Sequence, residues 1–301
     1  AHFVNIQDPL NPIGEGGYSG SGYTHDAQVV VYDGPDSDHT GKEIYIGSNE
    51  DFVTIVDVTD KSNPQLISNV LYSNTSYTHQ GWFTEDLTYF IMGDEIDELD
   101  FGFDTRNIIF DFTDLDNPEL AFEYTGPTSA TDHNGYVKGD KFYLANYKAG
   151  MRVVDISDIA NGNMTETGYF DVFIYGNSAG YDGAWNVYPY FESGNIIISS
   201  LVYSDPNYVP GFYLVKPSSL GMGDNTISNF NIHPNPSSSN VKISATETQI
   251  KTIDVYDLNG KLVISNQYNS VATTDLNVAD LSSGIYLLKI NKQVSKKLIK
   301  N

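Results

Sequence analysis

The sequence contains no cysteine, which excludes disulfide bonds, thiolate zinc sites and cysteine nucleophiles. Basic residues are also scarce, since 16 Lys and Arg stand against 39 Asp and Glu for a formal net charge of −23. Nucleic acids and anionic lipid surfaces are bound through Lys and Arg that neutralise phosphates, so this charge argues against both as partners. No apolar run approaches the ~20 residues that span a bilayer, and we therefore expect no transmembrane segment.

The negative charge is concentrated in the first three quarters of the chain. Residues 1–225 hold 34 acids against 8 Lys and Arg, a net of −26, and residues 226–301 hold 5 acids against 8 Lys, a net of +3. The two sums recover −23. An acidic body suits calcium, cationic partners or simply solubility in salt.

Four segments of the acidic body align with one another. Each is the end of an apolar strand that runs into a turn: VNIQDPLNP from Val4, VDVTDKSNP from Val56, FDFTDLDNP from Phe110 and VDISDIANG from Val154. Asp and Asn favour such turns because their side chains bond the nearby backbone. The repeated aspartates at and before the turns are Asp8, Asp60, Asp114 and Asp158, and Asp57, Asp111 and Asp155.

A second repeated column contains histidine. The contexts YTHDAQ, YTHQGW and TDHNGY place three of the six histidines in one register, His25, His79 and His133, and a fourth copy, YDGAWN, has Asp182 in that place. An aromatic column, Trp82, Tyr136 and Trp185, lies three residues further on. Scattered surface residues would not share a register, so we expect the three histidines to have the same structural or functional role.

The repeat predicts the fold class. The spacing is 54 residues from His25 to His79 and again to His133, and each unit contains about four short strands and no convincing helix. Four-stranded repeats of this kind are typical of β-propeller blades, with a parallel β-helix as the competitor. We therefore expect an all-β chain with propeller blades over residues 1–217. Only about four units are visible, so we expect further blades upstream of them.

The C-terminal part has a different pattern. A Ser/Gly/Asn-rich linker is expected at 218–229, and residues 230–301 then alternate short strands with turns such as LNGK from Leu258, which predicts a small Ig-like β-sandwich. The segments HPNP, IDVYDLNGKLV and LSSGIYLLKI and the Lys-rich end resemble the type A C-terminal sorting domain of the type IX secretion system. The resemblance implies recognition of residues 230–301 by that machinery, export to the outside or outer surface of a Gram-negative bacterium, and cleavage of the tail.

The acidic body carries a second resemblance. EDFVTIVDVTDKSNP and MRVVDISD are similar to LVIVD repeats, and residues 1–217 resemble the choice-of-anchor B family, which combines a propeller-like body with varied C-terminal signals. The leading blades of that family are absent here. No defined activity comes with the resemblance.

The histidine column has three possible roles. Equivalent positions of successive blades form a ring, so His25, His79 and His133, with Asp182, could bind a transition metal that polarises a substrate or activates a water. Alternatively, each histidine is buried and bonded to the Asp57, Asp111 and Asp155 column, which pins the blades together. The third role is a catalytic base.

Two further patterns are weaker. GDEIDELDFGFD offers Asp94, Asp97 and Asp100 as oxygen ligands for calcium, although the spacing is not that of an EF-hand, and a solvated acidic hairpin is the alternative. The aromatic column could stack on a glycan or simply pack between blades.

These patterns together predict a secreted or cell-surface binding protein whose extracellular ligand is a protein, a glycan or an ion. The alternative is a metal-dependent extracellular hydrolase or lyase that uses the histidine ring. A third possibility is a structural surface-layer component. The cofactor in question is a divalent cation, either a transition metal at the histidines or calcium at the acidic loops.

Overall fold

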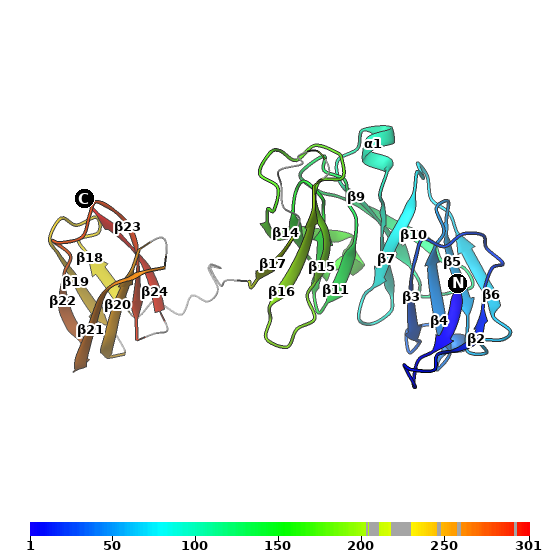
Figure 1. The fold of residues 1–301 in the computed structure, drawn as a ribbon, viewed down its shortest axis with the longest axis horizontal. Coiled ribbons are helices and arrows are strands. Elements are labelled where there is room, and N and C mark those ends of the chain that lie inside the picture. The colour runs from blue at the N-terminus through cyan, green and yellow to red at the C-terminus, as the bar shows by residue number, and fades with distance from the viewer. Residues whose placement is uncertain (203, 205–210, 218–229, 246–247, 258–259, 292–293) are drawn as a thin grey trace. The chain divides into compact units, whose positions relative to one another are not determined.

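The computed structural model describes residues 1–202, 204, 211–217, 230–245, 248–257, 260–291 and 294–301. The chain forms two compact units, Ala1–Pro217 and Ser218–Asn301 (Figure 1). The expected linker at 218–229 and part of the LNGK turn lie outside the described residues.

The first unit is built from antiparallel sheets whose strands follow chain order. A two-stranded sheet comes first and contains β1 (His2–Asn5) and β2 (Ile13–Gly17). Three four-stranded sheets follow: β3 (Asp26–Val31), β4 (Glu43–Ser48), β5 (Val53–Asp57) and β6 (Gln65–Val70); β7 (Thr78–Phe83), β8 (Tyr89–Asp94), β9 (Arg106–Asp111) and β10 (Glu119–Thr125); β11 (Gly135–Lys138), β12 (Lys141–Ala145), β13 (Met151–Asp158) and β14 (Asn163–Phe170). A three-stranded sheet ends the unit, with β15 (Gly183–Tyr188), β16 (Ile196–Leu201) and β17 (Gly211–Val215).

These sheets are propeller blades, which confirms the predicted fold class. The first strand of each blade contacts the first strand of the next, in the order β3, β7, β11 and β15. Figure 1 shows the blades side by side in chain order. Residues at the start of each first strand are therefore brought close together although about 54 residues separate them in the chain.

Successive side chains of each strand point to opposite faces of its sheet. Buried apolar side chains on these faces form the clusters through which neighbouring blades pack. The cluster between the first two blades is rich in phenylalanine, and the Phe90 and Phe112 rings stack at 5.5 Å. Two glycines of the first strands lie directly under aromatic rings. A Cβ atom at Gly81 would lie 2.2 Å from Phe90, and one at Gly135 would lie 2.2 Å from Phe142, so neither position has room for a side chain.

The repeated aspartates form the turns at the outer ends of the blades. Asp60 accepts hydrogen bonds from the backbone N–H and the hydroxyl of Ser62, and Asp8 and Asp114 accept equivalent backbone bonds. Asp158 accepts side-chain bonds from Asn161 and Asn163. These contacts are the local turn chemistry that the sequence indicates.

Short helices interrupt the strands, contrary to the expectation of a helix-free repeat. The acidic stretch expected as a hairpin instead forms α1 (Asp97–Phe101) between β8 and β9, and Gly102 ends it with a φ of 73°. Two single turns, η1 (Ser37–His39) and η2 (Ile159–Asn161), lie elsewhere in the unit. None of the described helices is long and apolar enough to cross a membrane.

The second unit is a β-sandwich, as predicted. One sheet contains β18 (Phe230–His233), β19 (Asn240–Ala245) and β22 (Thr273–Asn277). The other contains β21 (Leu262–Val271), β20 (Ile250–Tyr256), β23 (Gly284–Ile290) and β24 (Val294–Lys300). Buried aliphatic side chains from both sheets, such as Val241, Ile253 and Leu288, form its core.

Gln80 joins the second blade to the third, and its loss should destabilise the first unit. Its buried amide accepts from the N–H of Gly135 at 2.9 Å and donates to the Gly135 carbonyl at 3.1 Å. Gln80→Met leaves both backbone groups unpaired, so we expect the free energy of unfolding to fall by about 2–4 kcal/mol. Urea unfolding of the full chain, followed by tryptophan fluorescence, measures this because both tryptophans lie in the first unit.

The matched control is Gln65→Met on the exposed face of β6, where we expect a change within about 0.5 kcal/mol. Equal effects of the two substitutions would contradict the role given to Gln80.

Candidate functional site

The three repeated histidines form a row of rings at the starts of the blades. His79 lies in β7, and His25 and His133 lie just before β3 and β11. The ring centroids are 4.3 Å apart from His25 to His79 and 4.5 Å apart from His79 to His133. His25 is exposed, whereas His79 and His133 are each only 3% exposed. The row continues to Trp185, whose ring lies 4.5 Å from that of His133.

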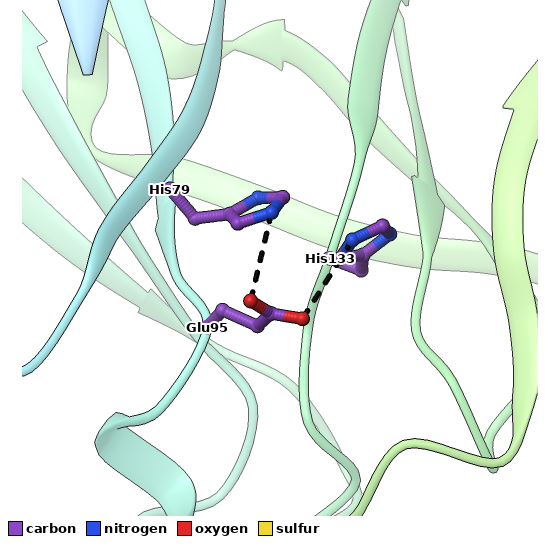
Figure 2. A group of neighbouring side chains, drawn as sticks. All are labelled: His79, Glu95 and His133. Atoms are coloured by element: carbon purple, nitrogen blue, oxygen red, sulfur yellow. Dashed lines mark ion pairs between the residues drawn. The ribbon is translucent and has the colours of Figure 1, made fainter. Parts of the chain in front are cut away.

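A glutamate completes the buried part of the row. Glu95 directly follows β8, and its two carboxylate oxygens lie 3.6 Å from Nε2 of His79 and 3.6 Å from Nε2 of His133. Figure 2 shows both imidazoles pointing toward this carboxylate. The hydroxyl of Tyr147, from the third blade, donates a hydrogen bond of 2.5 Å to Oε1 of Glu95. The site therefore combines side chains of two adjacent blades.

The tautomer of His133 is set by its backbone contact. Its Nδ1 faces the carbonyl oxygen of Trp185, which can only accept, so Nδ1 carries the proton and donates. In the neutral ring Nε2 then has a free lone pair, and this lone pair faces a carboxylate oxygen. Two acceptors that face each other in a buried site need either a proton or a metal ion between them.

Both buried histidines are held in the neutral form. Burial, with the neighbouring His133 and His25 rings, lowers the pKa of His79 to about 2. Burial likewise lowers the pKa of His133 to about 4, against an opposing effect of the Trp185 carbonyl. Nδ1 of His79 is buried and makes no hydrogen bond of normal geometry. Neither imidazole is therefore protonated at neutral pH, whereas burial raises the pKa of the Glu95 carboxyl.

The geometry suits a transition-metal ion. The ligand atoms of His79, Glu95 and His133 all lie within 4.8 Å of one another. Two ligands about 2.1 Å from a tetrahedral ion are roughly 3.4 Å apart, close to the two observed separations of 3.6 Å. Two histidines and one glutamate also form a known donor set of catalytic zinc, which keeps a further position open for water or substrate.

A second group of potential ligands is already paired. Asp36, His39 and Asp116 also have ligand atoms within 4.8 Å. Nε2 of His39 lies 2.9 Å from Asp116, and Lys42 donates to its Nδ1 at 3.2 Å. Because both ring nitrogens have partners, this group is explained as an ion-pair network that joins the first two blades.

Two sequence expectations for the column do not match the contacts. Asp182, the expected fourth member, accepts a backbone bond from Ser204, and the fourth place in the row belongs to Trp185. The aspartates expected to pin the histidines bond instead to nearby turn residues. Their partners are the backbone N–H groups of Thr59 for Asp57, Thr113 for Asp111 and Ser157 for Asp155.

The aromatic column also divides. Trp82 and Tyr136 pack edge to face at 4.9 Å between the second and third blades. Trp185 instead contacts His133 and Tyr147, and 36% of it is exposed. Only Trp185 is therefore part of the candidate site.

The proposed calcium ligands are not gathered in one loop. Asp94 is buried and accepts from the backbone of Ser76 and Tyr77 and from the hydroxyl of Tyr72. Asp100 is exposed and accepts from the hydroxyl of Ser76. Asp97 is the only one of the three that is buried and has an oxygen without a hydrogen bond.

The sequence analysis did not select Glu95 as a ligand because Glu95 lies outside the repeated histidine column. The one feature of the sequence that points to it is the acidic pair Asp94 and Glu95 at the end of a strand.

The second unit carries the comparison that identifies it. The segments that resemble a sorting signal lie within its two sheets, and its last strand, β24, is rich in lysine. Residues 231–301 match the secretion system C-terminal sorting domain. This sorting domain indicates export through the type IX system to the cell surface or the medium, with cleavage of the tail. None of the curated proteins matches the sequence significantly.

Several solved structures are similar at low identity. Dihydro-heme d1 dehydrogenase NirN is 12% identical, with a TM-score of 0.44 and coverage of 93% of this chain and 57% of its own. PorZ, a surface component of the type-IX secretion system of Porphyromonas gingivalis, is 12% identical, with a TM-score of 0.39 and coverage of 98% and 41%. The Cps50 (Swd1) propeller domain of Myceliophteria thermophila is 9% identical, with a TM-score of 0.35 and full coverage of both chains.

This chain spans only about half the length of the first two of these proteins. Likeness at this level says nothing of what the chain binds.

The neutral state of the two buried histidines can be tested by NMR. In metal-free protein we expect the ring signals of His79 and His133 to stay constant from pH 8 to pH 5, because burial lowers both pKa values well below 6.5. His133 should begin to titrate only as the pH approaches about 4. The His79→Gln and His133→Gln variants assign the signals. An inflection near pH 6.5 for either ring would show that the site is wet rather than buried.

Proposed function

We propose that this chain is an extracellular propeller protein that binds a divalent transition metal between His79, Glu95 and His133. The observation that carries the proposal is the Glu95 carboxylate placed 3.6 Å from an Nε2 atom of each of two buried imidazoles. The Trp185 carbonyl supports it, because it directs the lone pair of His133 toward the carboxylate. Export by the type IX system brings the site to the cell exterior.

The family assignment of the first unit is part of the same proposal. We assign residues 1–217 to the LVIVD-repeat, choice-of-anchor B group on the motifs EDFVTIVDVTDKSNP and MRVVDISD. The first motif contains β5 of the first blade, and the second motif is β13 of the third blade, which begins just after His133. An extracellular protein or glycan partner would meet the metal near its exposed neighbours, His25 and Trp185.

A metal-dependent hydrolase or lyase is the second candidate. Three protein ligands leave a coordination position open, and an ion there can lower the pKa of a bound water or polarise a substrate oxygen. Tyr147 would then hold Glu95 in place through its hydroxyl. Zinc-dependent cleavage of a nitrophenyl ester or phosphodiester that disappears in Glu95→Ala would favour this candidate over simple binding.

Metal binding is tested directly on the full chain. After chelator treatment, we expect one equivalent of Zn²⁺ to bind by calorimetry, and Co²⁺ to give the visible absorption of a tetrahedral site. His79→Ala, Glu95→Ala and His133→Ala should each weaken binding by more than the roughly 10–100-fold that loss of a hydrogen bond to a metal ligand costs. Tyr147→Phe, which removes the hydrogen bond to Glu95, should fall within that range.

The matched control is His233→Ala, since His233 is an exposed histidine of the sorting domain. Circular dichroism shows whether each variant is folded. Folded His79→Ala or His133→Ala protein that binds zinc as tightly as the parent would refute the site.

A further inference from the structure

A second buried polar cluster lies beside the candidate metal site and involves none of its three ligands. It contains Asp97 and Glu98 of α1, Asn107 of β9 and Asp132, which precedes His133. Their exposed fractions are 0%, 3%, 0% and 0%. Four polar side chains in such a dry environment need hydrogen-bond partners or counter-charges for every oxygen.

One oxygen of each carboxylate has a partner. Oδ2 of Asp97 accepts from Nε of Arg106 at 2.7 Å. Oε1 of Glu98 accepts from the backbone N–H groups of Arg106 and Asp132, both at 3.3 Å. Oδ2 of Asp132 accepts from Nδ2 of Asn107 at 2.6 Å. These bonds link the four residues into one group around Arg106.

The remaining oxygen of each residue has no donor. The buried atoms without a hydrogen bond are Oδ1 of Asp97, Oε2 of Glu98, Oδ1 of Asp132 and Oδ1 of Asn107. All four are oxygens, and each belongs to a side chain whose other polar atom is already used inside the cluster. Asn107 is the most telling, because it is neutral and its orphaned oxygen cannot be satisfied by protonating the residue.

The charge of the cluster is also uncompensated. Arg106 is the cation in direct contact, and it is shared between Asp97 and exposed Glu123. When ionised, the three buried carboxylates face one shared guanidinium, which leaves the cluster short of positive charge.

We propose that a calcium ion binds in this cluster through the orphaned oxygens of Asp97, Glu98, Asn107 and Asp132. Calcium takes six to eight oxygen ligands, including carboxylates and amide carbonyls, so waters or backbone oxygens complete its shell. The donor set contains no nitrogen or sulfur, which disfavours a transition metal. Magnesium retains several of its waters and needs strict octahedral geometry, which a buried cluster does not offer.

The carboxylates must move to bind the ion. Their oxygens are not among the groups whose ligand atoms already lie within 4.8 Å of one another. A bound ion then ties α1 and β9 of the second blade to the segment that enters the third blade. Glu95 lies two residues before Asp97, and His133 follows Asp132, so the ion would fix both sides of the transition-metal site.

The test uses the full chain after chelator treatment, with no transition metal added. We expect calcium in the millimolar range to raise the melting temperature by several degrees, because a ligand that binds only the folded state stabilises it by mass action. Terbium, a luminescent substitute for calcium, should bind with one equivalent and be displaced by calcium. The same shift should occur in His79→Ala, which separates this site from the transition-metal site.

Variants locate the ion. Glu98→Gln and Asp132→Asn keep the size of the side chain and remove a charge, so each should remove most of the calcium-induced shift and of the terbium signal. Asp100→Asn, an exposed acid of the same segment, is the matched control and should retain both. If one cluster variant does not fold, the other carries the comparison.

Three results would overturn the proposal. The first is a melting temperature that calcium leaves unchanged between pH 6 and pH 8, which would mean that protons satisfy the carboxylates. The second is an equal shift with magnesium, which would contradict the assignment to calcium. The third is a shift that survives in both Glu98→Gln and Asp132→Asn.

Discussion

The close approach of neighbouring first strands is the constraint on which the rest of the structure depends. Gly81 and Gly135 lie against phenylalanine rings at distances that exclude any side chain, and Gln80 bonds both backbone groups of Gly135. Phe90 and Phe142 lie in the second strands of the same blades, so the glycines let each first strand pack against its own blade, while the Gln80 bonds hold the second blade to the third. With the strands in register, residues 54 positions apart become neighbours, and the histidine ring centroids lie 4.3 and 4.5 Å apart.

The histidine row shows how far a repeat can be read from sequence. A shared register in three repeats predicts that His25, His79 and His133 lie together, and the structure places their rings side by side in a row. The blades and the C-terminal sandwich are equally visible, because both depend on local strand and turn patterns. Glu95 could not be found this way, because it occurs in one blade only and reaches the histidines through tertiary packing.

The acidic stretch from Gly93 shows the opposite case. Its composition indicates cation binding, and the sequence alone suggests Asp94, Asp97 and Asp100 as the ligands. In the structure, the buried residues whose oxygens lack hydrogen bonds are instead Asp97, Glu98, Asn107 and Asp132. The difference arises because α1 turns Asp97 and Glu98 inward and leaves Asp100 at the surface. Which acids face inward depends on a five-residue helix whose formation is decided by its surroundings, and Asp132 comes from a different blade.

The hydroxyl of Tyr147 crosses from the third blade to a glutamate of the second. Together with His133 it makes the candidate site an inter-blade contact as well as a binding site. Thermodynamic linkage then requires that an ion bound there strengthens the blade-to-blade junction by the same free energy by which separation of the blades would weaken its binding. The occupancy of the site thereby becomes a measure of how firmly two neighbouring blades are joined.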